Sequence, residues 1–192
     1  MRREASIDPC YFEALYRVCR DPWGFETSAY EAAKYARTLE VLPDPPGALL
    51  EVGCSIGVLT AQLAPRCAQL LALDVSETAL GIAAQRCVAF PNTTFAQMRV
   101  PQQLPPGRFD TVLLSEVVYY WDSADVARVA EWLPRALTDH GHVLLVHWTG
   151  PTDYPKSGDE AVENLRAGLG SSVVVAREER TDDYRLDVWR RA

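Results

Sequence analysis

Two short segments of this chain combine glycines and acidic residues at a spacing that suits a nucleoside ligand. Residues 49–57 read LLEVGCSIG and residues 70–74 read LLALD, so each apolar run ends beside an acid. In a strand-turn-helix-strand unit, Gly53 lets the chain turn off its strand and Gly57 lets the backbone approach a ligand. Asp74, at the end of the second strand, is placed to accept hydrogen bonds from both ribose hydroxyls. The pattern therefore predicts a ligand that contains a ribose.

The glycine spacing separates this segment from that of dinucleotide-binding enzymes. Those enzymes use G-x-G-x-x-G and aim a helix N-terminus at a pyrophosphate, whereas this chain has E-x-G-x-S-x-G. Glu51 would repel a diphosphate, but it suits a ligand that carries ammonium and sulfonium charges. S-adenosylmethionine is such a ligand, and we predict it as the cofactor, with S-adenosylhomocysteine as its product. A nicotinamide oxidoreductase is the alternative that this spacing disfavours.

The turn itself is expected to form a bed for the amino-acid and ribose parts of the ligand. Cys54 and Ser55 would contribute backbone N–H groups to it, between Gly53 and Gly57. A plain strand-to-helix turn is the alternative. For Asp74 the alternative is a helix N-terminal acid, because a predicted helix begins directly after it.

The segment resembles the first motif of class I methyltransferases, [DE]-x-G-x-G-x-G, with Ser55 in place of the middle glycine. The resemblance implies an aspartate that contacts adenine after the third strand, but Arg99 stands at that position. Met98 can still pack on the adenine ring, and the Arg99 backbone N–H can bond a ring nitrogen. The alternative is that both are ordinary loop residues.

Candidate catalytic residues follow the fourth and fifth predicted strands. Ser115 and Glu116 end the fourth strand, opposite the methyl donor in this fold, and Glu116 could hold an ammonium acceptor or take its proton. Its alternative role is to cap the next turn or to bond the N-terminal helical lid that we predict over residues 1–47. Tyr119 and Tyr120 could wall the pocket or belong to the core. His147 ends the fifth strand and is either a general base at neutral pH or a structural histidine. We predict Glu116, His147 and Tyr119 as catalytic.

Several further segments resemble the nodulation protein S family, whose members are S-adenosylmethionine-dependent N-methyltransferases acting on the free amine of a deacetylated chitooligosaccharide. These segments are residues 21–23, 50–54, 63–67, 74–75, 85–86 and 116–120. In that family a tryptophan-bearing N-terminal segment closes over the donor. The resemblance therefore implies that Trp23, and with it Tyr30, covers the donor in this chain. The predicted cofactor-binding residues are Trp23, Glu51, Gly53, Cys54, Ser55, Gly57, Asp74, Val75, Met98, Arg99 and Ser115.

The resemblance implies an amine-bearing small-molecule acceptor, such as an amino sugar or oligosaccharide. Two alternatives stay open. One is O-methylation of a hydroxylated small molecule, with His147 as the base. The other is a catalytically inactive partner protein that binds the donor.

Two other patterns are decoys. Tyr30 and Lys34 spell the Y-x-x-x-K of short-chain dehydrogenases, but they precede the glycine turn, whereas that catalytic pair would follow it. His140 and His142 flank Gly141 in a predicted turn, which suits an exposed connection better than metal ligands. The five cysteines lack C-x-x-C spacing, so we predict free thiols and no metal site.

The elements that must position these residues alternate along the chain. Strands are predicted at 48–52, 70–74, 93–97, 109–115, 142–147, 172–177 and 184–190, and helices at 11–20, 28–42, 58–64, 77–88, 123–137 and 159–169. Such alternation predicts an α/β fold with a mostly parallel sheet covered on both faces. With the resemblance, this becomes a Rossmann-like class I methyltransferase fold of seven strands. Residues 1–192 form one domain, with a helical lid over 1–47 and the core over 48–192.

The net charge and the distribution of apolar residues limit the kinds of partner that the chain can bind. The 192 residues are 48% hydrophobic and carry a net charge of −7, which disfavours a nucleic-acid partner because phosphate binding needs concentrated basic surface. No apolar run approaches a bilayer span, and the start lacks the apolar core of a signal peptide. We therefore expect a cytoplasmic protein without a membrane partner.

Overall fold

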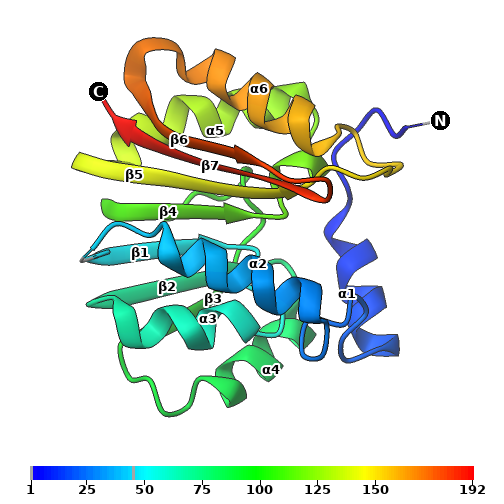
Figure 1. Cartoon of the computed structure of the whole chain (residues 1–192). Helices are drawn as coiled ribbons and strands as arrows, with labels where there is room; N and C mark the ends of the chain where they lie inside the picture. The colour runs from blue at the N-terminus through cyan, green and yellow to red at the C-terminus, as the bar shows by residue number, and fades with distance from the viewer. Residues whose placement is uncertain (1, 45) are drawn as a thin grey trace.

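The computed structural model describes residues 2–44 and 46–192, which form a seven-stranded sheet with helices on both faces (Figure 1). The strands are β1 (Ala48–Val52), β2 (Gln69–Asp74), β3 (Thr93–Gln97), β4 (Phe109–Ser115), β5 (Leu137–Trp148), β6 (Val173–Arg180) and β7 (Tyr184–Arg191). Their order is β3-β2-β1-β4-β5-β7-β6, and β7 runs antiparallel to both of its neighbours. The predicted mostly parallel sheet of seven strands is confirmed, and its last two strands, β6 and β7, form an antiparallel pair.

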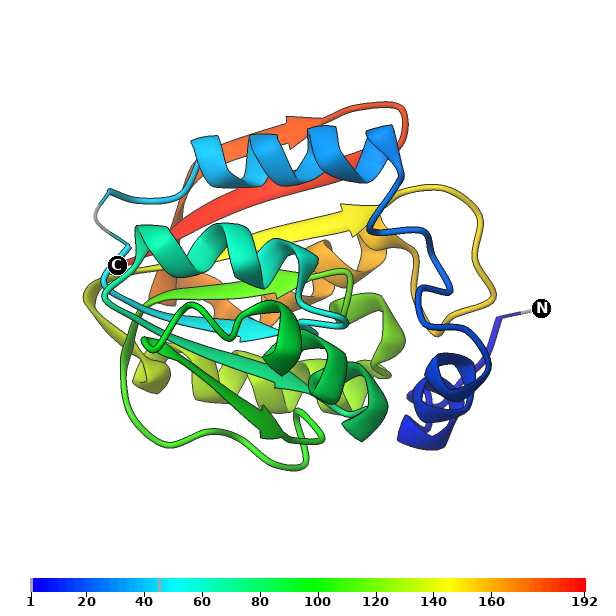
Figure 2. The same cartoon turned by 90° about the horizontal axis from the view of Figure 1, so that it is seen from below.

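The described residues form six α-helices, which cover both faces of the sheet and one end of its strands. They are α1 (Pro9–Val18), α2 (Ala29–Glu40), α3 (Val58–Leu63), α4 (Glu77–Arg86), α5 (Ser123–Ala136) and α6 (Gly158–Leu169), with short 3-10 turns η1 (Ala64–Arg66), η2 (Val118–Tyr120) and η3 (Gly170–Ser172). Helices α2 and α3 cover one face of the sheet and α5 and α6 cover the other (Figure 2). Within residues 2–44 and 46–192, no helix combines the length and the apolar character needed to cross a membrane.

Both faces of the sheet are apolar because successive strand residues point to opposite sides. Leu113 packs with the α2 and α3 side, whereas Leu114 packs with the α5 and α6 side. Leu49 and Leu50 divide between the two faces in the same way. Neither face is solvated, so the order of apolar residues fixes the strands without showing which helix lies over which side.

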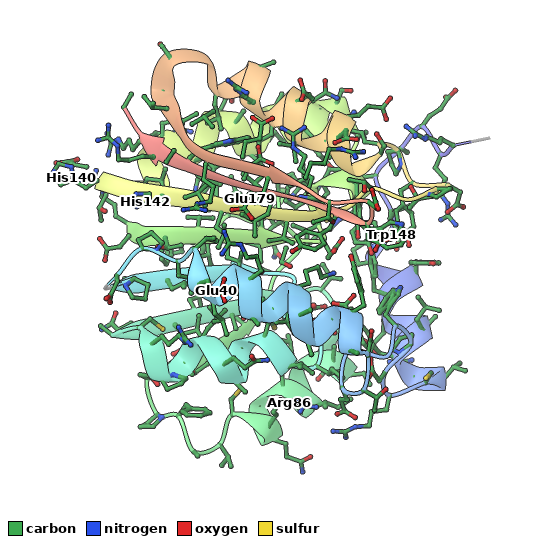
Figure 3. The ribbon with its side chains drawn as sticks, in the orientation of Figure 1. Glu40, Arg86, His140, His142, Trp148 and Glu179 are labelled. Carbon is green, nitrogen blue, oxygen red and sulfur yellow. The ribbon has the colours of Figure 1, made fainter. Side chains whose placement is uncertain are left out.

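Strand β5 is longer than the sequence indicated. It begins at Leu137, so His140 and His142 lie within a strand and not in a turn. They lie at the opposite end of the strands from Trp148, which lies at the end near α1 (Figure 3). This geometry places both histidines far from the carboxyl ends of the parallel strands.

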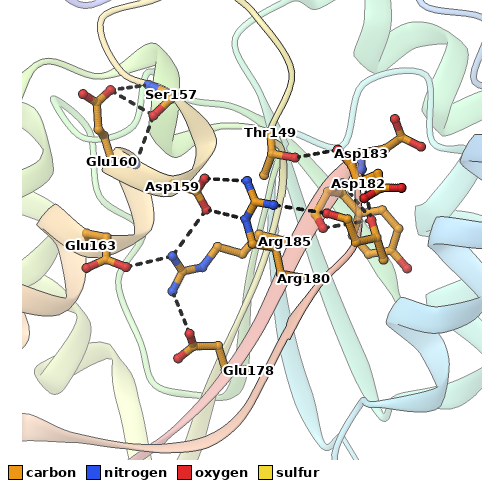
Figure 4. A network of polar contacts seen from close by, with 12 residues as sticks. Thr149, Ser157, Asp159, Glu160, Glu163, Glu178, Arg180, Asp182, Asp183 and Arg185 are labelled. Atoms are coloured by element: carbon orange, nitrogen blue, oxygen red, sulfur yellow. Dashed lines mark hydrogen bonds and ion pairs between the residues drawn. The ribbon is translucent and has the colours of Figure 1, made fainter.

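An ion network attaches the antiparallel hairpin to α6 (Figure 4). The Arg185 guanidinium, with a side chain only 5% exposed, bonds the Asp187 carboxylate at 2.7 Å and the Glu163 carboxylate at 2.9 Å. Arg180 bonds Asp159 at 2.9 Å. A buried cation is tolerated only when carboxylates satisfy its donors, and here those acids come from both β7 and α6. The network fixes the sheet edge that flanks β5.

Candidate functional site

A cavity of about 420 Å³ opens at the carboxyl ends of β1, β2 and β4, beneath the N-terminal segment. The volume lies in the range of small-molecule sites. Ten of the fourteen predicted site residues line it: Trp23, Gly53, Ser55, Asp74, Val75, Met98, Arg99, Ser115, Glu116 and Tyr119. The other four, Glu51, Cys54, Gly57 and His147, are not among its lining residues.

The glycines of the turn serve packing. Gly53 has φ of +83°, and a Cβ there would lie 2.3 Å from a Val117 methyl carbon. Gly57 has φ of +78°, and a Cβ there would lie 2.9 Å from the Cα of Ala83 in α4. Gly57 therefore allows close packing of the turn on α4, and it lies outside the cavity lining.

The backbone N–H groups of the turn are already bonded within the protein. Gly53 and Cys54 both donate to the Leu73 carbonyl, at 2.8 and 2.9 Å. Ser55 donates to the Asp74 carboxylate at 2.8 Å. These bonds join the end of β1 to the end of β2, so the expectation that Cys54 and Ser55 offer N–H groups to the ligand does not fit this geometry.

The Asp74 carboxylate lies in the cavity wall, where two backbone N–H groups hold it. One carboxylate oxygen accepts the Ser55 N–H and the other accepts the Ser76 N–H, at 2.9 Å, while the side chain lines the cavity. A carboxylate offers about four acceptor positions, so two stay available for ribose hydroxyls. Burial raises the pKa of Asp74, and the backbone donors partly offset this rise.

The wall beside Asp74 is largely apolar. Val75, Met98 and Val100 line the cavity. The Met98 N–H donates to the Asp74 carbonyl at 3.0 Å, and the Arg99 N–H donates to the Gln103 side chain at 2.8 Å. The Arg99 N–H is thus engaged, contrary to its predicted bond to an adenine nitrogen, while Met98 keeps a position suited to packing on a ring.

Glu51 faces away from the cavity. Glu51 is two residues after Leu49 in β1, so both side chains point to the face covered by α3. There the Glu51 carboxylate accepts a hydrogen bond from the Thr60 hydroxyl at 2.7 Å. Its exposure is 2%, and burial raises its pKa to about 7. Glu51 is therefore not positioned to contact a ligand in this cavity, contrary to the prediction from the sequence.

Glu116 follows β4 and lines the same cavity, and its carboxylate is held by three donors. Lys34 donates to Oε1 at 2.6 Å, and the Tyr119 hydroxyl and the Trp148 N–H donate to Oε2 at 2.6 and 2.9 Å. Its side chain is 17% exposed, toward the cavity. Burial alone would raise the pKa of Glu116, but the Lys34 charge and these hydrogen bonds outweigh burial and lower it.

The hydrogen bond to Glu116 also shows the role of the Tyr119 hydroxyl. Burial and the adjacent Glu116 charge raise the pKa of Tyr119 well above its ordinary value, so its hydroxyl keeps its proton and donates it. Tyr119 therefore orients Glu116 and is not itself a base at neutral pH.

His147 is buried beneath the site. It is 0% exposed, and its Nε2 accepts the Val118 N–H at 3.1 Å. Burial lowers its pKa to about 4, so the ring is neutral at pH 7. With that lone pair engaged and the ring outside the cavity, His147 is not positioned to act as a general base on a bound acceptor.

The N-terminal segment covers the cavity beside the glycine turn. Trp23 lies edge-on to Tyr16, with ring centroids 5.6 Å apart, and stacks on Phe25 at 5.7 Å. Tyr16 and Ser55 are hydrogen-bonded through their hydroxyls, and the Glu13 carboxylate accepts the Ser76 hydroxyl at 2.7 Å. The segment thus closes over the glycine turn.

Helix α2 contributes both residues of the Y-x-x-x-K pattern, which we set aside above as a dehydrogenase motif. Tyr30 and Lys34 both line the cavity, with the Lys34 ammonium 5.1 Å from the Tyr30 ring centroid. Ser28 caps the N-terminus of this helix, since its hydroxyl accepts the Glu31 N–H at 3.2 Å. The Glu31 carboxylate, however, accepts from Lys34 at 3.0 Å.

Comparison with known proteins identifies the family. The model of Nodulation protein S (NodS) matches residues 15–138. This chain belongs to the NodS family. It is 30% identical to Nodulation protein S of Sinorhizobium fredii over 138 residues, which are 69% of this chain and 64% of that protein. With the Rhizobium tropici protein it shares 30% identity over 127 residues, 65% of this chain and 53% of that one. The matches thus span less than two thirds of these relatives.

Solved structures agree with this assignment. A putative methyltransferase from Pseudomonas syringae is 34% identical, with a TM-score of 0.75 over 85% of this chain and 100% of that chain. N-methyltransferase NodS from Bradyrhizobium japonicum WM9, in complex with S-adenosyl-L-homocysteine, has a TM-score of 0.83 at 22% identity, covering 96% and 99%. The predicted family and the class I methyltransferase fold are confirmed.

Proposed function

We propose that this NodS family member transfers the methyl group of S-adenosylmethionine to an amine nitrogen of a small-molecule acceptor. The observation that carries the proposal is that the Glu116 carboxylate faces the same cavity as Gly53, Ser55 and Asp74. The relatives support it, because the N-methyltransferase NodS from Bradyrhizobium japonicum WM9 has been solved in complex with S-adenosyl-L-homocysteine, the demethylated form of this donor.

The cavity residues fit the donor part by part. Asp74 keeps acceptor positions for the ribose hydroxyls, and Val75 and Met98 offer apolar surface to the adenine. Gly53 and Ser115 lie at paired strand ends, since Val52 of β1 pairs with Leu114 of β4. The amino-acid part of the donor would lie over these ends, which directs the methyl group toward Glu116.

Glu116 suits the acceptor end because methyl transfer moves positive charge onto nitrogen. S-adenosylmethionine supplies an activated methyl group whose sulfur leaves as a neutral thioether. As the new N–C bond forms, Glu116 accepts an N–H hydrogen bond from the acceptor and stabilises the charge that develops there. Its lowered pKa makes Glu116 a weak base, so it holds the amine in line while the excess proton passes to water after transfer.

Aromatic side chains support an amino-sugar or oligosaccharide acceptor. Tyr30, Tyr119 and Trp148 surround Glu116 in the cavity lining and offer rigid apolar surface to a sugar ring. O-methylation is less well supported, because its expected base, His147, is buried and engaged. An inactive donor-binding protein is also less well supported, because Asp74 and Glu116 line one cavity.

The test has two stages. Calorimetry compares S-adenosylhomocysteine with NAD, and we expect binding of the former only. Mass spectrometry then follows incorporation of one CH₂ unit into glucosamine and deacetylated chitooligosaccharides, with their N-acetylated forms as controls. Glu116→Gln should reduce turnover while donor affinity stays near wild type. Binding of S-adenosylhomocysteine with methylation of the N-acetylated controls would instead establish O-methylation.

A further inference from the structure

Lys34 is a positively charged residue whose side chain is buried in the wall of the cavity. Its side chain is 3% exposed, and its ammonium lies 2.6 Å from Glu116 and 3.0 Å from Glu31. Burying an ammonium costs free energy unless nearby anions compensate for the lost water. Both compensating carboxylates line the same cavity, so the resulting cluster is part of the site wall.

A second cation on the same helix shows what is particular to Lys34. Arg37 bonds Glu179 of β6 at 2.9 Å and Glu40 at 2.6 Å, and all three lie outside the cavity lining. Figure 3 shows Glu40 and Glu179 away from the end of the strands where Trp148 lies. Both cations therefore hold α2 to the sheet, but only Lys34 does so through a residue that faces the acceptor.

The bonds to Glu116 leave one defined place for a further donor. A carboxylate has about four acceptor positions. The Tyr119 hydroxyl and the Trp148 N–H occupy Oε2, and Lys34 occupies one position of Oε1. The remaining position lies on Oε1, the oxygen that Lys34 orients. Glu116 also has φ of 58°, a conformation that costs a non-glycine residue free energy and needs such surrounding contacts.

We propose that Lys34 is a positioning residue for the methyl acceptor: its ion pair fixes the charge and the orientation of Glu116, leaving one Oε1 acceptor position for the amine N–H. The inference rests on the proposed function, because it concerns the same acceptor. It also makes the site depend on α2, which precedes the glycine turn in the sequence and packs on the sheet through Tyr35 and Leu39.

The expected effect of removing Lys34 follows from the groups around Glu116. These groups are Tyr30, Glu31, Lys34 and Tyr35 from α2, Tyr119 and Tyr120 from η2, His147 from β5 and Tyr154 from the following loop. His147 is neutral at pH 7, and Glu31 repels a second negative charge. Without Lys34, the burial of Glu116 would be opposed only by the remaining hydrogen bonds and by the nearby His147 ring, so the pKa of Glu116 should rise.

Nuclear magnetic resonance of protein with ¹³C-labelled glutamate carboxyls tests this directly, without any acceptor. The Glu116 signal is assigned as the one lost in Glu116→Gln. We expect its titration midpoint to rise by about one unit or more in Lys34→Met, to stay low in Lys34→Arg, and to stay at the wild-type value in the control Arg37→Met. Lys34→Gln serves as the neutral variant should Lys34→Met fail to fold. An unchanged midpoint in the neutral variant would overturn the inference.

Kinetics separate positioning from a structural role. With the amine that wild type methylates best, we expect kcat/KM for that amine to fall about tenfold or more in Lys34→Met, and its acid limb to move to higher pH. Affinity for S-adenosylhomocysteine should stay near wild type in every variant. Parallel loss of both would assign Lys34 to the donor or to folding. If wild type methylates no amine, the proposed function fails and the acceptor role fails with it, while the titration still decides whether Lys34 controls Glu116.

Discussion

The Tyr16 hydroxyl lies 2.5 Å from the Ser55 side-chain oxygen, so helix α1 is hydrogen-bonded directly to the glycine turn. Ser55 has φ of 53°, in the left-handed region that favours glycine. A serine there costs some backbone free energy but supplies the hydroxyl that anchors α1. The departure from the middle glycine of the motif thus has a structural consequence: the N-terminal segment is hydrogen-bonded to the turn that lines the cavity.

Removing one hydroxyl tests this coupling. In Tyr16→Phe the ring stays packed while the hydrogen bond to Ser55 is lost, at a cost of about 1 kcal/mol. We expect S-adenosylhomocysteine to dissociate several-fold faster, and proteases to cleave residues 2–28 faster. Stopped-flow fluorescence and limited proteolysis measure the two effects. Tyr11→Phe is the control on the same helix, because that ring faces Arg3, 5.2 Å from its centroid. Equal dissociation rates in both variants would show that α1 does not gate the donor.

Asp74 should control donor affinity. Asp74→Asn puts a donor group where one oxygen now accepts an N–H from Ser55 or Ser76, and it removes the charge that binds ribose hydroxyls. We expect affinity for S-adenosylhomocysteine to fall about tenfold or more, as measured by calorimetry.

Asp110→Asn is the matched control for that substitution. The Asp110 carboxylate accepts the Ala48 N–H at 2.8 Å, at the start of β1 and outside the cavity lining. This variant should lose thermal stability and retain donor affinity. Similar affinity losses in both variants would mean that sheet distortion, and not ribose contact, explains the effect of Asp74→Asn.

Glu51 should make stability depend on pH. Its pKa rises from 4.5 to about 7 in the folded protein because of burial. Between these values the folded state binds more protons than the unfolded state, so stability falls as pH rises through this window. Glu51→Gln removes that loss and should be more stable than wild type at pH 8, by up to about 3 kcal/mol. The difference should shrink toward pH 5.

Urea unfolding of the two proteins at several pH values measures this difference. Other titrating groups, such as His147, are common to both proteins and cancel in the comparison. A constant difference between Glu51→Gln and wild type across pH 5 to 8 would contradict the assigned pKa shift.

The sequence predicted Asp74 and Glu116 at the cavity because both follow parallel strands, and carboxyl ends of such strands meet at one edge. It misplaced Glu51 because both faces of β1 are apolar, and the pattern does not show that α3 covers the side shared by Leu49 and Glu51. Lys34 carries no local signal either: its place depends on how α2 packs on a sheet that comes later in the chain. Engagement of the turn N–H groups likewise depends on contacts between strands.

Gly57 gives a test of packing against ligand approach. In Gly57→Ala the new Cβ would lie 2.9 Å from the Ala83 backbone and the φ of +78° would be strained, so we expect destabilisation of about 1–3 kcal/mol. Gly81→Ala, within α4 and with nothing within 4 Å of the added Cβ, should instead stabilise the protein by up to about 1 kcal/mol.

Thermal unfolding measures both glycine variants, and calorimetry below the Tm measures S-adenosylhomocysteine binding to the folded fraction. Because Gly57 lies outside the cavity lining, Gly57→Ala should lower the Tm while the folded protein keeps most of its donor affinity. The opposite pattern, with unchanged Tm and lost affinity, would restore the role that the glycine spacing first suggested, in which Gly57 clears the way for the ligand and α4 yields to the added methyl group.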